Sequence, residues 1–331
     1  MSRPSRVALA RRRALARARP RARVRRPPTA RFRVAVDAAR ARAARQCATR
    51  RFFVMSSSLR RPRVVTAPAR VRARRATPQR AYALRPRALG TLYDVPVSNN
   101  GARCRLLARW LDLYDDLDVV DPSVAFADGG IKSAAYAAIN PQLKMPTFVA
   151  ANGLCVPESE VINAYLTDAA SEGARRSATP RTIEARTNGT LATRVHDQYL
   201  VPIQGAMYRG PMDRATRATQ LAEIARQLRI LDEIVGREDG DFAAGETKSA
   251  ADAALFPTLI FCDFLLPKYF GWDRPFGANL RRMYEAVKRD PDGEVVYAEV
   301  RGGLEAWERA GRFEKVGIVD DVADASFQWS F

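Results

Sequence analysis

The stretch LKMPTFVAANGLCVPES, residues 143–159, sets a proline beside each of two short apolar runs that are joined by an Asn-Gly pair. The Asn-Gly pair is a hairpin signal, so the two runs predict adjacent strands. Pro146 stands before the first strand, where it removes one backbone hydrogen-bond donor. Pro157 ends the second strand and favours the start of a helix, which opens with Glu158 and Ser159. The stretch therefore predicts a hairpin that leads directly into a helix.

On the N-terminal side of this hairpin, strand-like and helical patterns alternate. The expected elements are a strand at 91–97, a capping turn at 98–101, a helix at 102–111, a strand at the end of 115–120, a loop at 121–132, a helix at 133–140, strands at 147–150 and 154–156, and a helix at 158–169. This order predicts a small α/β domain at residues 91–170.

On the C-terminal side, a linker is expected at 171–180, after which every pattern is helical. Long helices are expected at 181–208, 213–236, 249–266, 276–289 and 294–311. Because no strong strand candidate remains, we expect an all-α domain at 181–313, followed by a surface tail at 314–331. The longest apolar run, around 253–267, is interrupted by Pro257 and Asp263, so we expect no membrane span.

The first 90 residues carry all of the excess positive charge. They contain 28 arginines, no lysine and one acidic residue, Asp37, whereas the rest of the chain holds 27 basic and 35 acidic residues. An Arg-rich segment almost free of acid is typical of an organellar transit peptide. We therefore expect residues 1–90 to be a disordered targeting leader, with Met55 as a possible true start. The serines after Met55 favour a plastid over a mitochondrion.

Two other interpretations of the leader stay open. One is a gene-model artefact upstream of Met55, which would leave a cytoplasmic protein. The other is a basic arm for nucleic acid, but the aromatic residues that such an arm interleaves with its cations are lacking, so we expect no nucleic-acid partner. Four scattered cysteines without a CxxC motif and a single histidine, His196, predict no metal site.

Four further segments carry a resemblance to a known family. They are LYDVPVSNNGARCRLLA at 92–108, NPQLKMPTFV at 140–149, PESEVINAYL at 157–166 and FAAGETKSAADAALFP at 242–257. In this order and spacing they resemble the cytosolic-type glutathione S-transferases, over about residues 91–312. The resemblance implies a thioredoxin-like α/β first domain, an all-α second domain, glutathione as substrate or cofactor, and a homodimer.

The resemblance also implies a glutathione-binding site. Met145 and Pro146 would be joined by a cis peptide bond, and the main chain of Met145 would pair with the cysteine backbone of glutathione. Ser159 would bind the γ-glutamyl carboxylate and Glu158 the neighbouring amine, at a helix N-terminus that attracts anions. Lys144 would lie near the glycine carboxylate. Leu143, where the family usually has glycine, is unexplained, and it leaves the placement of Lys144 open.

Ser98 stands at the strand–helix joint, where the Ser-type classes have their catalytic serine, and a plain N-cap is its alternative role. Asn100 is a second candidate, because an amide can donate to a thiolate. Asn99 and Asn100 replace the Ser-Cys pair of the zeta class, so the chain is only partly zeta-like. Cys104 lies about two turns into the helix, which disfavours thiol–disulfide chemistry, and Tyr93 is expected in the core.

The resemblance implies a transferase that conjugates glutathione to hydrophobic electrophiles in detoxification. The alternatives are a glutathione-dependent isomerase, a non-catalytic glutathione-binding protein, and an interaction module. The electrophile is expected between the Ser98 turn and the first long helix of the second domain, beside His196, Tyr199 and Tyr208. Ser249 and Asp252 are expected to form a structural capping box.

Overall fold

The computed structural model describes residues 89–126, 128–324, 327 and 329. Except for its last two positions, the expected leader, including Met55, lies outside the described residues. Both expected domains belong to one compact unit of the chain.

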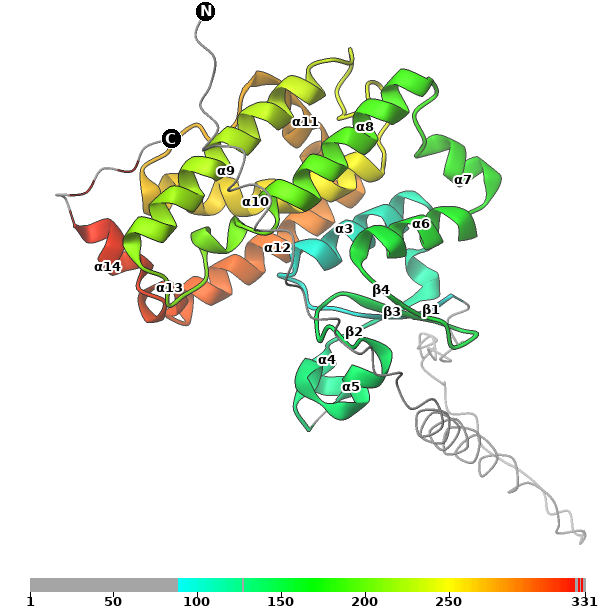
Figure 1. Ribbon diagram of the computed structural model, residues 1–331. Coiled ribbons are helices and arrows are strands. Elements are labelled where there is room, and N and C mark those ends of the chain that lie inside the picture. The colour runs from blue at the N-terminus through cyan, green and yellow to red at the C-terminus, as the bar shows by residue number, and fades with distance from the viewer. Residues whose placement is uncertain (1–88, 127, 325–326, 328, 330–331) are drawn as a thin grey trace, which may run out of the picture. The chain divides into compact units, whose positions relative to one another are not determined.

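A four-stranded sheet forms the centre of the first domain (Figure 1). Its strands are β1 (Gly90–Tyr93), β2 (Leu117–Val120), β3 (Thr147–Ala150) and β4 (Cys155–Pro157). They lie in the order β2-β1-β3-β4, with β1 parallel to β2 and antiparallel to β3, and β3 antiparallel to β4. Tyr93 pairs with Val120 and Thr147, and Thr147 pairs with Pro157. The ends of β1, β2 and β4 and the start of β3 therefore meet at one edge.

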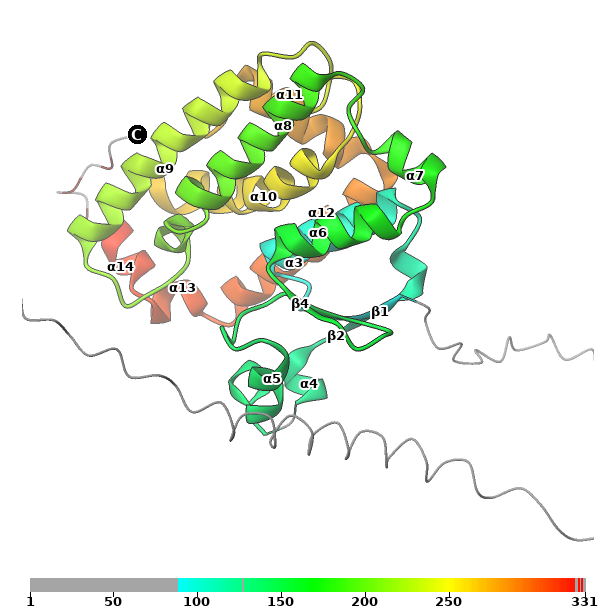
Figure 2. The same ribbon diagram turned by 45° about the vertical axis from the view of Figure 1, so that its right-hand side comes forward.

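Helices cover both faces of this sheet. In Figures 1 and 2, α3 (Asn99–Trp110) and α6 (Ser159–Ala169) lie on one side, and α4 (Pro122–Ala125) and α5 (Ala134–Ile139) lie on the other. Two short 3-10 turns, η1 (Tyr114–Asp116) and η2 (Gly130–Lys132), complete the domain. The thioredoxin-like α/β domain expected from the sequence is confirmed.

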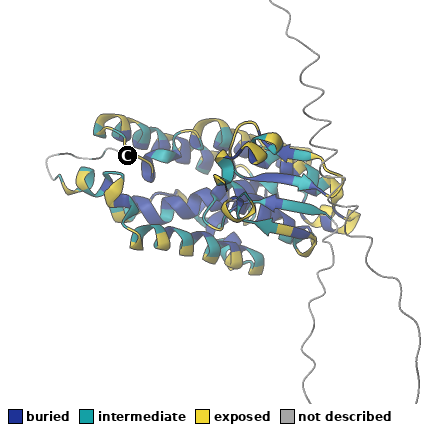
Figure 3. Ribbon diagram, turned by 90° about the horizontal axis from the view of Figure 1, so that it is seen from below, coloured by how far each residue is buried: buried dark blue, intermediate teal, exposed yellow. Residues whose placement is uncertain are grey.

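The second domain is helical throughout its described residues, as expected. Its principal helices are α8 (Ile183–Val195), α9 (Arg214–Val235), α10 (Ala250–Phe270), α11 (Ala278–Arg289) and α12 (Pro291–Arg309). Helix α10 is apolar on nearly all sides and packs against α3, α8 and α12. A helix with this composition is expected at the centre of a domain, and the inward faces of the surrounding helices are buried against it (Figure 3).

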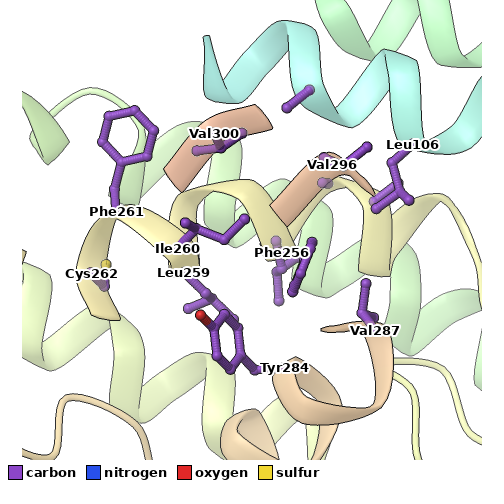
Figure 4. Close-up of a cluster of buried hydrophobic side chains, with 14 of the residues drawn as sticks. Leu106, Phe256, Leu259, Ile260, Phe261, Cys262, Tyr284, Val287, Val296 and Val300 are labelled. Carbon is purple, nitrogen blue, oxygen red and sulfur yellow. The ribbon is translucent and has the colours of Figure 1, made fainter. Parts of the chain in front are cut away.

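The two domains share one hydrophobic core. Figure 4 shows Leu106 of α3 beside Val296 of α12, in one cluster with Val300 of α12 and with Phe256 and Ile260 of α10, and all five side chains are buried. Because α3 also carries the turn after β1 at its N-terminus, this packing fixes that turn against the helical domain.

Three boundaries in the first half differ from the sequence-based expectation. The strand expected at 91–97 ends at Tyr93, before Pro96. The loop expected at 121–132 contains α4, because Asp121 caps that helix and proline occupies its first turn. The linker expected at 171–180 contains a further helix, α7 (Glu172–Ser177), whose N-cap is Ser171.

The second half also differs in two places. The helix expected at 181–208 ends at Val195 and continues as a π turn, η3 (His196–Leu200), and a 3-10 turn, η4 (Gln204–Met207). The expected surface tail contains α13 (Arg312–Lys315) and α14 (Ile318–Ala323), in which Ile318 is buried. Fully buried Arg217 of α9 holds this segment, since its Nε lies 2.9 Å from Asp321 Oδ2.

Helix α10 is longer than expected and runs through both Pro257 and Pro267. Among the described residues it alone is long and apolar enough to cross a membrane. Most of its apolar stretch is buried inside the protein, as in the core helix of a folded domain.

Candidate active site

The turn after β1 places Ser98 at the N-terminus of α3. Ser98 is half-buried, and its Oγ accepts a hydrogen bond of 3.1 Å from the backbone N–H of Gly101. A hydroxyl that accepts in this way keeps its own proton for donation to another group. The N-terminal amides of α3 add partial positive charge at the same point. The N-cap role of Ser98 is therefore confirmed, and it is compatible with donation to an anion.

Met145 and Pro146 are joined by a cis peptide bond, as the resemblance implied. Two buried side chains hold the loop in front of this bond: the hydroxyl of Tyr136 donates to the carbonyl of Lys144 at 2.7 Å, and Asn140 Nδ2 donates to the same carbonyl at 2.9 Å. The main chain of Met145 is thereby positioned at the sheet edge where β1 ends and β3 begins.

The N-terminus of α6 reaches the same edge, directly after β4. Exposed Glu158 occupies the N-cap position with φ 70°, and its side chain does not cap the helix. The first amides of α6 can therefore bind an anion. The buried Cys104 thiol of α3 donates to the carbonyls of Asn100 and Ser159, at 3.6 and 3.5 Å. The first turns of α3 and α6 are consequently neighbours.

A buried arginine lies beneath the α6 N-terminus. The guanidinium of Arg103 donates to Ser159 Oγ at 3.3 Å and to Asp197 Oδ1 at 2.8 Å, and it is also paired with Glu160. Its side chain is 2% exposed. Burial raises the pKa of Glu160, and the charge of Arg103 opposes that rise. Arg103 thus ties α3, α6 and η3 together around Ser159.

A chain of buried polar groups continues from Asp197 to the turn after β1. His196 Nδ1 lies 2.9 Å from Asp197 Oδ1, and His196 Nε2 lies 2.8 Å from Thr258 Oγ1 of α10. Asn99 Nδ2 donates to Thr258 Oγ1 at 3.0 Å and to Gln204 Oε1 at 2.6 Å. Burial lowers the pKa of His196, which favours the neutral ring. Asn99, which follows Ser98, is therefore anchored to the second domain.

Comparison with known proteins agrees with this geometry. The family model for the glutathione S-transferase N-terminal domain matches residues 92–174, and the model for the C-terminal domain matches residues 214–286. Both domains of this chain are therefore similar to those of the glutathione S-transferase family. The search of curated proteins found no match.

Solved glutathione transferases share the fold of this chain. URE2P6 of Phanerochaete chrysosporium, solved with oxidized glutathione, is 21% identical with a TM-score of 0.54, over 65% of this chain and 96% of the other. Poplar glutathione transferase F1 is 21% identical with a TM-score of 0.51, over 64% and 98%. A diazinon-metabolizing enzyme of the silkworm Bombyx mori is 18% identical with a TM-score of 0.51, over 65% and 98%.

The backbone conformation at position 143 accounts for the glycine that was expected where this chain has Leu143. Its φ is 55°, in the left-handed region that glycine adopts at no steric cost. This is the backbone reason for the glycine that the family usually has there. Lys144 is exposed, and only its carbonyl takes part in the hydrogen bonds of this loop.

The residues expected beside the electrophile are dispersed. His196 is 1% exposed and Tyr208 is 4% exposed, and Tyr208 packs on Phe261 and Trp307 with ring centroids 5.1 and 5.9 Å away. Because both side chains are almost completely buried, they offer no surface to an electrophile, and we do not retain them in an electrophile site. Tyr199 is 54% exposed on η3 and stays a prediction.

The expected capping box is confirmed. Asp252 accepts from the backbone N–H of Ser249 at 2.9 Å, from its hydroxyl at 2.8 Å, and from the N–H of Ala243 at 2.6 Å. Asp252 is completely buried, and burial raises its pKa to about 6. The box fixes the start of α10 to the preceding loop.

The sequence analysis did not predict the roles of Asp94 and Arg105 at the turn after β1. Asp94, which follows β1, is buried and paired with the equally buried Arg105 of α3, whose Nε lies 2.9 Å from Glu299 Oε2 of α12. Arg105 also donates to the carbonyl of Pro96 at 2.8 Å. The contact with Glu299 joins residues 194 positions apart in the sequence, and an Arg in an apolar helical pattern was the only local signal.

The three cysteines that the structure describes do not offer a reactive alternative. Burial raises the pKa of the Cys104 thiol to about 12 and also raises those of Cys155 and Cys262. A thiol with a raised pKa is a poor nucleophile at neutral pH. Among the described residues, no group of three or more His, Cys, Asp or Glu side chains could hold a metal ion.

Proposed function

We propose that this protein is a glutathione transferase that binds glutathione along the sheet edge and conjugates its thiolate to hydrophobic electrophiles. The observation that carries the proposal is the cis Met145-Pro146 bond at the edge where the Ser98 turn and the free N-terminus of α6 meet. Main-chain groups of Met145 would pair with the cysteine of glutathione, in the manner of an added strand.

The two ends of this edge suit the two tasks of the reaction. At α6, the helix amides and Ser159 would hold the γ-glutamyl carboxylate, and exposed Glu158 would meet the amine. At α3, the hydroxyl proton of Ser98 would stabilise the thiolate. A free thiol has a pKa of about 8.5, and lowering it by about 2 units requires roughly 2.7 kcal/mol of anion stabilisation. One hydroxyl donor beside a helix N-terminus is able to supply this amount.

Asn100 is the second donor we propose. Its side chain is half-buried on the first turn of α3, whereas the amide of Asn99 is already bound to Gln204 and Thr258. Asn99 therefore acts on the turn by anchoring it, and Asn100 is the asparagine left to face the ligand.

The experiment compares the wild-type protein with Ser98→Ala and Asn100→Ala. Titrating the ultraviolet absorbance of bound glutathione gives the pKa of its thiol, and conjugation of a chloronitrobenzene gives the rate. Ser98→Ala is expected to raise the thiol pKa by about 1–2 units and to lower the rate roughly 10- to 100-fold, with little change in glutathione affinity. An unchanged thiol pKa would remove Ser98 from the mechanism. Tight binding of glutathione without turnover in the wild type would favour a carrier protein instead.

We further propose a homodimer and a plastid location. The homodimer is supported by apolar side chains exposed on both domains, with Val161 of α6 54% exposed and Leu191 of α8 38% exposed. The Arg-rich composition of residues 1–90 supports the location. Sedimentation of the purified protein tests the first proposal, and the mature N-terminus, determined by mass spectrometry, tests the targeting leader.

A further inference from the structure

A cavity opens beside Met145 on the side away from α6. It has a volume of about 540 Å³ and is lined by Val95 of the turn after β1, by Met145, and by residues 121–123 and 129–131. A volume of this size is in the range of small-molecule sites. A single glycine residue would leave most of it empty.

The order of the strands shows which part of a bound peptide would reach this cavity. The sheet order is β2-β1-β3-β4, and the site runs along the edge where β4 leads into Ser159, β3 begins after Met145, and β2 leads into Asp121. A peptide with its γ-glutamyl end at Ser159 and its cysteine on Met145 must direct its C-terminal residue toward Asp121. This step rests on the function proposed above.

The charge of the cavity does not suit a carboxylate. Among the described residues, Asp121 is the only charged one in its lining, which contains no Lys, Arg or His. Oδ1 of Asp121 accepts from the N–H and the hydroxyl of Ser123, both at 2.7 Å, while Oδ2 makes no hydrogen bond to the part of the chain that the structure describes. A free C-terminal carboxylate placed there would face a like charge, and like charges repel.

The two lysines that adjoin lining residues in the sequence lie outside the lining itself. Lys132 follows Ile131 and Lys144 precedes Met145, and both side chains are exposed to solvent. Exposed lysines contribute little to an ion pair because water and salt screen them. The sign of the charge that the cavity prefers on a bound group is therefore set by Asp121, which favours a positive charge.

We propose that Asp121 makes this site selective for thiol peptides whose C-terminal carboxylate is capped, and above all for those capped with a cationic group. The class of substrate is a γ-glutamyl-cysteinyl-glycine thiol joined through an amide to an amine-bearing chain. The Asp121 carboxylate pairs with the amine, and the apolar walls formed by Val95, Ile131 and Met145 contact the carbon chain.

Calorimetry of the full chain with three probes tests the proposal: glutathione, its glycyl ethyl ester, and its glycyl 3-aminopropyl amide. The wild type is expected to bind the ester at least as well as glutathione and the cationic amide about fivefold more tightly than the ester, as for one partly exposed ion pair. Asp121→Asn keeps a residue that can cap α4 and should abolish only the advantage of the cation. Asp128→Asn, an exposed carboxylate of the same loop outside the lining, is the matched control and should change nothing.

The opposite results separate this inference from the proposed function. If glutathione binds much more tightly than its ester, the carboxylate is recognised and the role of Asp121 is wrong, while the transferase proposal stands; Lys132→Ala and Lys144→Ala then show which lysine recognises it. An equal advantage of the cation in Asp121→Asn also overturns the inference alone. If none of the three peptides binds, both proposals fail together.

Discussion

Val97 and Gly303 touch across the domain boundary: a β-carbon on Gly303 of α12 would lie 2.5 Å from Cβ of Val97. Val97 directly precedes Ser98, so α12 supports the turn that carries Ser98 through the contact at Gly303. The contact is too close for any other residue at position 303 unless the turn moves. The position of the Ser98 hydroxyl is therefore set in part by the second domain.

Gly303→Ala tests whether the contact with Val97 positions Ser98, and Gly302→Ala provides the control. The added methyl group should displace Val97, lower the free energy of unfolding by about 1–3 kcal/mol, and reduce conjugation roughly tenfold with an increase in the thiol pKa of bound glutathione. A β-carbon on Gly302 would meet no described atom within 4 Å, so Gly302→Ala should stabilise α12 by about 0.5–1 kcal/mol. Loss of stability in Gly303→Ala with an unchanged thiol pKa would reduce the contact to packing alone.

Replacing Leu143 with glycine is expected to stabilise the folded protein. Its φ of 55° costs a leucine about 1–2 kcal/mol relative to glycine, whereas glycine loses more entropy on folding. Leu143→Gly is expected to raise the free energy of unfolding by about 0.5–1 kcal/mol in urea titrations. Leu154 is also exposed, but its φ is not positive, so Leu154→Gly should destabilise the protein by a similar amount. Equal losses in both variants would contradict the strain at Leu143.

Replacing Arg103 with an uncharged residue is expected to reduce both the stability of the protein and its affinity for glutathione. Arg103→Met leaves Ser159 without its buried donor and removes the cation that the carboxylates of Glu160 and Asp197 share. Breaking a buried pair costs about 3–5 kcal/mol, and the 46% exposure of Glu160 reduces this to about 2–3 kcal/mol. We also expect roughly tenfold weaker glutathione binding by calorimetry.

The surface pair Glu172–Arg176 provides the control for Arg103, because both side chains are more than half exposed. Arg176→Met should change stability by less than about 0.5 kcal/mol and leave glutathione binding unaltered. Glutathione affinity that survives Arg103→Met would show that Ser159 needs no support from α3.

The hairpin and the start of α6 were predictable because their signals are local: an Asn-Gly turn and a proline at a helix start act on neighbouring residues. The contacts of Arg103 and Arg105 were not predictable in this way, since their partners come from α6, η3 and α12. The burial of His196 depends likewise on Thr258, 62 residues away. Sequence therefore predicted which segments meet at the site, whereas the buried polar network that holds them required the packed helices.

The pH dependence of the free energy of unfolding should reveal the raised pKa of Asp252. In the folded protein burial raises its pKa to about 6, whereas an unfolded aspartate titrates near 4. Between these two values the folded state holds a proton that the unfolded state has lost, so the stability that this group contributes is present below about pH 4 and is lost as the pH rises through about 6. The difference corresponds to about 3 kcal/mol. Urea unfolding between pH 4.5 and 7.5 should show wild-type stability falling relative to Asp252→Asn, which has no proton to lose. Parallel pH profiles of the two proteins would mean that the three hydrogen bonds to the carboxylate outweigh its burial.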